Sequence, residues 1–304
     1  METSVVNLDE IVNKIVFQTF GVHPINIEEI KGKGKNNRVF KIELGNKAVI
    51  LRMNNTAEAL ELYKKEKWCA EVAGKTNVPT PAILNIGKQD EYAFSFQEFI
   101  EGIRGTDNLD ELGKIWLTLG KYANLINQIQ APDFSINYKD TIKNLFADDF
   151  FIVRNIFSKE VSNKIQSRLE ETLKWEFSPK LCHGNLHPNN VIVDSQGVIH
   201  LIDWETATGN KNPQSELAEI YTWKTGKENV ALFLEGYGLN QANIEIIMRD
   251  IQTLVLLRLT DVIRRKIIKN TTDSWKQDTY IQETATQLAS IDNYQEDILF
   301  TKNL

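Results

Sequence analysis

The feature that most constrains the fold is a short strand–turn–strand pattern inside an otherwise helical half of the chain. Residues 190–203 read "NVIVDSQGVIHLID", two apolar runs separated by a turn-forming Ser-Gln-Gly. Such a hairpin brings Asn190, at the start of one strand, close to Asp203, at the end of its partner. An amide oxygen and a carboxylate together suit Mg²⁺ bound with phosphates. The sequence therefore predicts a hairpin with a metal site at its open end.

A polar turn comes just before this hairpin. His183 and Asn185 lie in a segment that also contains Gly184 and Pro188. Loops held at the mouth of a rigid element often carry catalytic groups. We therefore expect His183 and Asn185 to belong to a catalytic turn.

A zinc site is the alternative interpretation of this region. The first two of its four potential ligands are adjacent in sequence, so their side chains diverge, and no Cys-x-x-Cys or His-Glu-x-x-His spacing occurs. Hydrogen bonds that stabilise the turn are the favoured role for its two histidines. The four potential ligands are Cys182, His183, His187 and His200.

The first hundred residues have the pattern of a small, mainly antiparallel sheet with one inserted helix. An amphipathic helix is expected at 5–19, and glycines and asparagines mark the turns between the strands that follow. Gly74 is a plausible end of the inserted helix. The expected strands are 26–32, 37–44, 47–53 and two more within 78–102, and the inserted helix is 56–74.

Helical periodicity dominates after Gly102, the hairpin excepted. We predict an α+β, two-lobed fold with a small antiparallel-sheet lobe at 1–101 and a larger, mainly helical lobe at 102–304 that includes the hairpin. The expected helices of the second lobe are 108–129, 139–175, 214–225, 227–237, 241–268 and 275–292.

A carboxylate lies on the apolar stripe of the inserted helix. Glu66 shares this stripe with Ala59, Cys69 and Ala73, and a buried carboxylate is costly without a cationic partner. Arg52 is the sole charge in the preceding strand, "AVILRM". We predict an Arg52–Glu66 ion pair, which serves either a phosphate site or the structure alone.

The turn "GKGKNN" at 32–37 is the second candidate phosphate contact. Gly32 and Gly34 permit close approach of the backbone to a phosphate, and the lysines add positive charge. Asn37 ends the turn. An ordinary hairpin turn has the same composition, so both interpretations stay open.

Several motifs together carry a family resemblance. "HGNLHPNN", "VIVD", "VIHLIDWE", "SELAEI" and "FLEGYGL" resemble the aminoglycoside phosphotransferase and choline kinase family, whose central motif is His-Gly-Asp, four residues, Asn, then Ile-Asp-Trp. The resemblance covers essentially the whole chain. It implies a protein-kinase-like fold and an ATP-dependent phosphotransferase that uses Mg²⁺ and a small-molecule hydroxyl acceptor.

The resemblance also implies roles for individual positions. Arg52 lies where the family has a phosphate-anchoring lysine, and Asn190 and Asp203 are the implied magnesium ligands. Glu216 corresponds to an aspartate that stabilises the catalytic turn. The segment "QEFIEG" resembles the hinge that binds a purine through its backbone, at Glu98, Phe99 and Ile100.

Asn185 departs from the family at the position of the catalytic aspartate. Asparagine orients an acceptor hydroxyl through its carbonyl oxygen but is no useful base, and general-base assistance contributes about 10²–10⁴ in rate. Three interpretations stay open: a slow or specialised kinase, in which Glu205 approaches the hydroxyl instead; a nucleotide-binding protein of the pseudokinase type; or a substitution introduced to trap a complex.

Composition limits the classes of molecule that the protein is expected to bind and the compartment in which it is expected. A net charge of −6 argues against nucleic-acid binding and is compatible with an amine-bearing acceptor. The N-terminus lacks the pattern of a secretion signal, no run is long enough to span a membrane, and two distant cysteines favour buried thiols, so we expect a cytoplasmic protein. Acidic residues that would select the acceptor, or lie on solvated helix faces, are Asp148, Asp149, Glu235 and those of "DNYQED" at 292–297.

Overall fold

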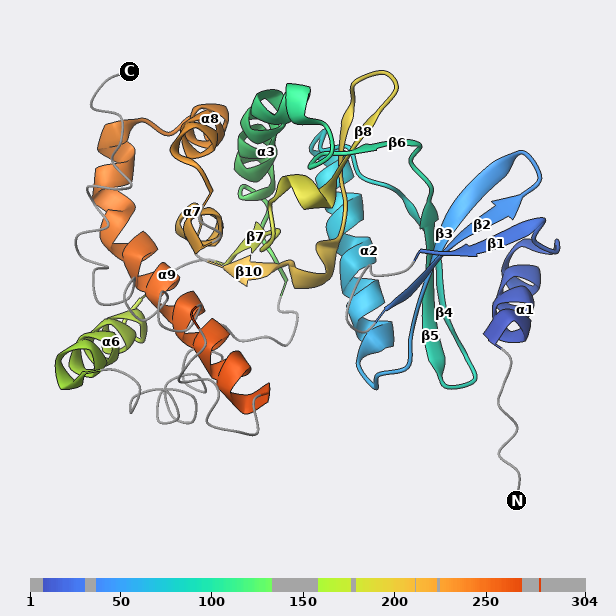
Figure 1. Ribbon diagram of the computed structural model, residues 1–304, viewed down its shortest axis with the longest axis horizontal. Coiled ribbons are helices and arrows are strands. Elements are labelled where there is room, and N and C mark those ends of the chain that lie inside the picture. Colours follow the sequence, from blue (N-terminus) through green and yellow to red (C-terminus); the bar gives the residue numbers. More distant parts are fainter. Residues whose placement is uncertain are drawn as a thin grey trace. The chain divides into compact units, whose positions relative to one another are not determined.

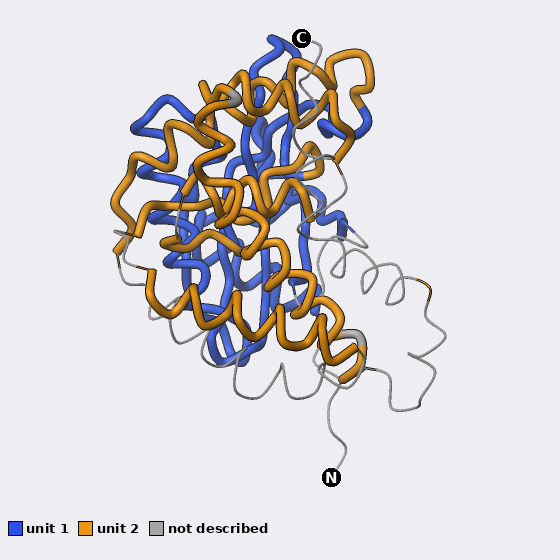
Figure 2. Tube along the Cα trace, turned by 90° about the vertical axis from the view of Figure 1, so that its left-hand side faces the viewer, with its two compact units in different colours: residues 1–107, 190–205 blue, residues 108–189, 206–304 orange. Residues whose placement is uncertain are grey.

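The computed structural model describes residues 8–30, 37–132, 158–175, 179–210, 212–222, 225–269 and 279. The chain forms two compact units, coloured separately in Figure 2. Unit 1 comprises residues 1–107 and 190–205, and unit 2 comprises 108–189 and 206–304. Each unit is described by itself below.

Unit 1 is built on a five-stranded antiparallel sheet. Its strand order is β1-β2-β3-β5-β4, and a two-residue turn at 45–46 joins β2 to β3 (Figure 1). The expected antiparallel sheet is confirmed, although the first strand ends three residues earlier than expected. The strands are β1 (Asn26–Glu29), β2 (Arg38–Leu44), β3 (Lys47–Asn54), β4 (Ile83–Gln89) and β5 (Tyr92–Glu98).

The two faces of this sheet are covered by different helices, α1 (Leu8–Phe20) and α2 (Ala59–Lys75), seen on either side of it in Figure 1. Successive residues of a strand point to opposite faces. On β3, Leu51 and Met53 join the buried cluster that contains α1. Arg52, between them, therefore points to the other face, where its side chain meets α2.

The hairpin is confirmed and extends into a second sheet. β8 (Val191–Asp194) pairs with β9 (Ile199–Leu201), and β8 also pairs with β6 (Gly102–Arg104), a strand that the sequence pattern did not indicate. Gly102 is needed there, because a Cβ atom would lie 2.3 Å from the Val193 carbonyl oxygen.

These contacts place the hairpin in unit 1, whereas the sequence-based division assigned it to the second lobe and put the boundary at residue 102. The backbone N–H of Leu201 also donates to the Pro79 carbonyl oxygen at 2.8 Å, which ties the hairpin to the segment before β4. Pairing across long sequence separations, which periodicity does not reveal, accounts for the difference.

In its described residues, unit 2 is mainly helical and contains one small sheet that the sequence did not predict, formed by β7 (Lys180–Cys182) and β10 (Thr208–Asn210). Helices α3 and α8 approach closely, because a Cβ atom on Gly120 would lie 2.0 Å from the Phe233 carbonyl oxygen. The helices are α3 (Leu112–Ile126), α6 (Lys159–Thr172), α7 (Gln214–Thr222), α8 (Lys227–Tyr237) and α9 (Gln241–Lys269).

Some expectations fall outside the described residues. These are the glycines Gly32 and Gly34, the helix expected at 275–292, the first part of the helix expected at 139–175, and the acidic candidates Asp148, Asp149 and 292–297. In the described part of the chain, no helix has the length and apolarity needed to cross a membrane. Cys69 and Cys182 are both buried free thiols, as expected.

Candidate active site

The predicted ion pair between Arg52 and Glu66 is confirmed. The Arg52 Nη1 donates to Glu66 Oε2, and the two residues are only 8% and 3% exposed. Burial by itself lowers the pKa of Arg52, but attraction from Glu66 and then from Asp203 raises it overall. The Arg52 guanidinium is therefore a fixed cation, held by Glu66 of α2 on the face of the sheet opposite to α1.

A second carboxylate meets the same guanidinium. Arg52 Nη2 lies 3.4 Å from Glu205 Oε2, and the Glu205 side chain is 42% exposed. Because the planar guanidinium presents separate N–H donors, one arginine holds two carboxylates at once. Arg52 thus links the buried Glu66 to a residue that lies just after the hairpin.

Asn37, at the end of the candidate phosphate turn, extends the cluster formed by Arg52, Glu66 and Glu205. Its amide Nδ2 donates to Glu205 Oε2 at 3.1 Å, and its Oδ1 accepts from Asn54 Nδ2 and from the Tyr63 hydroxyl, each at 3.0 Å. The Asn37 amide is therefore oriented by three side chains. Its predicted contact with phosphate stays a prediction.

The segment after the hairpin is fixed by hydrogen bonds to α2 and to the loop before β4. Lys65 Nζ donates to the Glu205 carbonyl oxygen at 2.6 Å, and Trp204 Nε1 donates to Thr80 Oγ1 at 3.1 Å. Burial lowers the pKa of Lys65. The turn η4 (Trp204–Thr206) thus has a fixed course immediately after Asp203.

The two predicted metal ligands lie at the open end of the hairpin. The Ile202 N–H donates to the Asn190 carbonyl oxygen at 2.9 Å, so the hairpin pairing continues to the residue before Asp203. Asp203 is exposed, acts on the pKa of both Arg52 and Glu66, and has a left-handed backbone with φ 67°. A left-handed aspartate costs free energy and often marks a functional position.

This donor set fits magnesium better than zinc. Among the described residues, no three His, Cys, Asp or Glu side chains gather into a metal site. One carboxylate and one amide oxygen suit Mg²⁺, which takes most of its remaining ligands from phosphates and water. The assignment of Asn190 and Asp203 as metal ligands stays a prediction.

The predicted catalytic turn belongs to unit 2 and is held by α7. The N–H of His183 donates to Glu216 Oε1 at 2.6 Å, and the His183 carbonyl oxygen accepts from Thr206 Oγ1 at 3.0 Å. Glu216 is fully buried, and burial raises its pKa. Gly184 has φ 76°, and a Cβ atom there would lie 2.8 Å from the Thr206 carbonyl oxygen, so only glycine fits before Asn185.

His187 stabilises the other end of this turn, as predicted. Its Nδ1 accepts from the Asn189 N–H at 3.2 Å, and its ring packs edge-on against Trp116 with 5.6 Å between centroids. Asn185 lies half-buried between these two anchored points. The sequence thus presents Asn185 on a turn whose conformation is determined on both sides.

The proposed purine hinge is partly used by the sheet itself. The Glu98 N–H donates to the Ala82 carbonyl oxygen, and Glu98 Oε2 accepts from the Ala82 N–H, both at 3.0 Å. Lys41 Nζ lies 4.8 Å from the centre of the Phe99 ring. A backbone donor to a purine would then come from Phe99, Ile100 or beyond, and the hinge role stays a prediction.

Sequence reasoning missed three members of the cluster, Lys65, Asn54 and Tyr63. Tyr63 and Lys65 lie on α2 and Asn54 ends β3, yet no motif marks them. Their contacts depend on residues 17 to 140 positions away, which only the fold brings together. Glu205 was considered only as a substitute base, and its ion pair with Arg52 was not foreseen.

The chain matches a known protein family over most of its length. The sequence pattern of the phosphotransferase enzyme family matches residues 27–245, more than two thirds of the chain. This chain belongs to that family. The resemblance to aminoglycoside phosphotransferases is therefore confirmed, as is the kinase-like fold with an antiparallel-sheet lobe and a helical lobe.

Two kinases are similar to this chain in sequence. Hygromycin-B 4-O-kinase of Escherichia coli is 23% identical over 215 residues, which cover 63% of this chain and 61% of that protein. A probable ketoamine kinase of Enterococcus faecium is 26% identical over 219 residues, which cover 62% of this chain and 73% of that protein. The match thus spans about three fifths of the hygromycin enzyme.

Crystal structures with the same fold cover far more of the chain. A thermostable mutant of aminoglycoside phosphotransferase APH(4)-Ia, in a ternary complex with AMP-PNP and hygromycin B, has a TM-score of 0.68 at 18% identity, over 93% of this chain and 98% of that one. A putative fructosamine-3-kinase from Haemophilus somnus has a TM-score of 0.61 at 16% identity, over 93% and 97%. At these identities, the likeness concerns the fold.

Proposed function

We propose that the protein is an ATP-dependent phosphotransferase that transfers the γ-phosphate to a hydroxyl group of a small molecule. The observation that carries the proposal is the cluster around Arg52: a buried cation held by Glu66, next to a hairpin that ends in Asn190 and Asp203. A fixed cation beside an oxygen-rich hairpin end is what a metal-bound triphosphate requires.

In this proposal the two units supply different functions. Arg52 and Asn37 in unit 1 contact phosphates, and Asn190 and Asp203 hold Mg²⁺, which would neutralise charge on the phosphates when bound. In unit 2, Asn185 orients the acceptor hydroxyl through its amide oxygen. Glu216 keeps that turn in place through the His183 N–H.

Acceptors with amino groups are favoured on two grounds. The chain carries a net charge of −6, and the related hygromycin-B 4-O-kinase and the probable ketoamine kinase are named for amine-bearing compounds. We therefore propose aminoglycoside-like or ketoamine-like hydroxyl compounds as the first acceptors to be tried.

Asn185 predicts slow turnover that an aspartate would accelerate. A carboxylate at this position restores the missing base, and the expected gain in transfer rate for Asn185→Asp is about 100-fold or more. The measurement is ADP release from ATP with a panel of amine-bearing hydroxyl compounds. If Asn185→Asp binds ATP with Mg²⁺ yet transfers to no compound at more than the background rate, the enzyme proposal fails.

Asn185 also favours one second candidate, a nucleotide-binding protein without turnover. Such a protein would bind ATP to stabilise one conformation. Thermal stabilisation by ATP that is the same with and without Mg²⁺ would favour this candidate, because a phosphotransferase of this family type needs its metal.

A further inference from the structure

The Glu205 carboxylate contacts two side chains, those of Arg52 and Asn37, that belong to the candidate phosphate site. Glu205 Oε2 lies 3.4 Å from Arg52 Nη2 and accepts from Asn37 Nδ2 at 3.1 Å. Arg52 lies where the family resemblance places a phosphate anchor, and Asn37 ends the turn that the sequence indicates as a candidate phosphate contact. A carboxylate oxygen and a phosphate oxygen have the same charge sign and accept the same hydrogen bonds.

The Glu205 backbone is held in place, whereas its side chain is partly exposed. The Glu205 carbonyl oxygen is fixed by Lys65 Nζ at 2.6 Å, and the neighbouring Trp204 is fixed by Thr80. The Glu205 side chain is 42% exposed, whereas that of Glu66, the other partner of Arg52, is 4% exposed. We therefore expect a phosphate to displace Glu205, rather than the buried Glu66, from Arg52.

We propose that Glu205 acts as an internal anion that competes with the nucleotide for Arg52 and Asn37, and thereby sets the affinity for nucleotide phosphates. This inference rests on the proposed function. Glu205 is two positions after Asp203 in the sequence, so we expect a cation held there to offset part of the cost of displacing its carboxylate. The competition is therefore strongest when no divalent cation is present.

Arginine at position 52 is what makes this competition possible. Its Nη1 serves Glu66 and its Nη2 serves Glu205, so both carboxylates are held by one rigid guanidinium. A lysine has a single ammonium group on a flexible stem. We expect a lysine at position 52 to stay with the buried Glu66 and to release Glu205.

The test is ATP binding by Glu205→Gln, measured by calorimetry in EDTA and again with Mg²⁺. Glutamine keeps the shape but removes the charge, so the ATP dissociation constant in EDTA should fall about fivefold to tenfold relative to the wild type. With Mg²⁺ the difference should be about twofold or less. Equal or weaker binding by Glu205→Gln in EDTA would overturn the inference.

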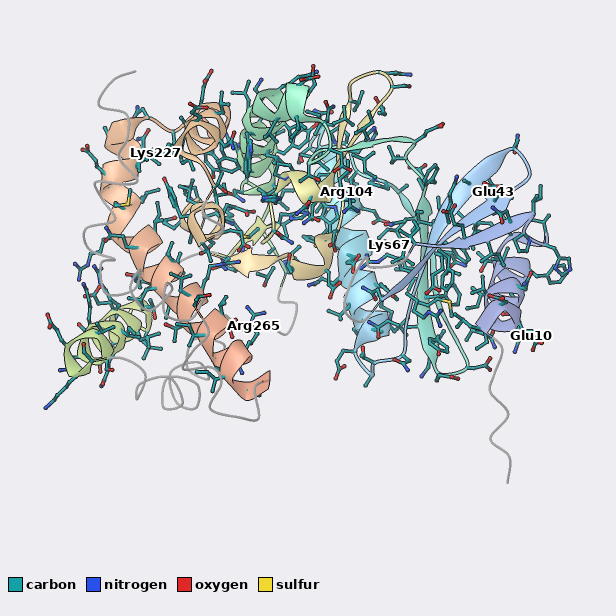
Figure 3. All side chains as sticks on the ribbon, in the orientation of Figure 1. Glu10, Glu43, Lys67, Arg104, Lys227 and Arg265 are labelled. Carbon is teal, nitrogen blue, oxygen red and sulfur yellow. The ribbon has the colours of Figure 1, made fainter. Side chains whose placement is uncertain are left out.

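Glu43→Gln is the matched control. Glu43, labelled on β2 in Figure 3, is in the same unit, its side chain is 39% exposed, and its carboxylate lies 3.6 Å from Lys41 Nζ. Removal of this charge should leave the ATP affinity unchanged. An equal gain in Glu43→Gln would overturn the inference, because it would reflect net charge alone.

A second variant tests whether the effect passes through Arg52. In an Arg52→Lys background, Glu205→Gln should change the affinity in EDTA by about twofold or less, since the charged contact with Arg52 is already broken and only the hydrogen bond from Asn37 remains. A full fivefold gain in that background would refute the competition. Wild-type protein that binds no ATP even with Mg²⁺ would refute the proposed function as well, whereas normal ATP binding with an inert Glu205→Gln refutes this inference alone.

Discussion

The Glu66→Leu substitution tests whether the buried cation is a structural requirement of unit 1. Arg52 is 8% exposed and loses its main partner in this variant. Removal of one member of a buried ion pair costs about 3–5 kcal/mol, because the remaining charge is left uncompensated. Asp203 and Glu205 still attract the guanidinium, so the lower end of this range, about 3 kcal/mol, is expected.

Urea unfolding followed by circular dichroism measures this loss. With a slope of about 2 kcal/mol per molar urea, a loss of about 3 kcal/mol lowers the unfolding midpoint by roughly 1.5 M. The control is Glu61→Leu on the same helix, where the side chain is 74% exposed and pairs with Lys64 at 2.7 Å. An exposed pair of this kind contributes less than about 1 kcal/mol.

The combined Arg52→Met and Glu66→Leu protein separates the two possible causes of the loss. Because it buries no charge, it should recover much of the stability that Glu66→Leu loses. If Glu66→Leu shifts the midpoint no more than Glu61→Leu does, the pair is not the buried constraint that its contacts indicate.

Three further predictions concern unit 2. Gly184→Ala should lower the free energy of unfolding by about 2 kcal/mol or more, measured by thermal unfolding, because alanine is strained at positive φ and its Cβ atom would meet Thr206. The control is Gly113→Ala in α3, where the nearest contact of the added Cβ atom is at 3.4 Å. This variant should be neutral or stabilising. Gly120→Ala should cost about 2–3 kcal/mol by forcing α3 and α8 apart, and an unchanged melting temperature would contradict that packing. Because burial raises the pKa of Glu216, the folded protein keeps the Glu216 proton to a higher pH than the unfolded chain does. The free energy of unfolding of the wild type should therefore fall relative to that of Glu216→Gln as the pH rises above 4.5. Urea unfolding over a range of pH measures this, and a free-energy difference between the two proteins that does not change with pH would contradict it.

Local patterns were sufficient to predict the five-stranded sheet of unit 1 and the helix inserted into it. Strict alternation on β3 predicts that Arg52 lies on the opposite face from Leu51 and Met53, and the helical stripe on α2 predicts that Glu66 faces inward. An interior carboxylate and an interior cation on neighbouring elements then have one favourable arrangement, which is the one found.

What escaped prediction depends on long-range contacts. The pairing of β6 with β8 joins residues 102–104 to the hairpin nearly ninety positions later in the sequence. The three residues of β6 are too few to show the alternation of apolar and polar residues that predicts a strand. Likewise, nothing in the sequence around Glu205 indicates that it meets Arg52 and Asn37. Such contacts are determined by the assembled sheet, not by either segment alone.

We propose that Asn190 and Asp203 hold a metal ion that helps Arg52 bind a triphosphate. The most direct measurement is calorimetric titration of ATP into the wild type and into Asp203→Asn, with Mg²⁺ and with EDTA. Asparagine adopts the left-handed backbone of position 203 readily, so the variant should fold. We predict that Mg²⁺ tightens ATP binding at least about tenfold in the wild type and that Asp203→Asn loses most of this gain. Equal binding of ATP with and without Mg²⁺ in the wild type would contradict the claim.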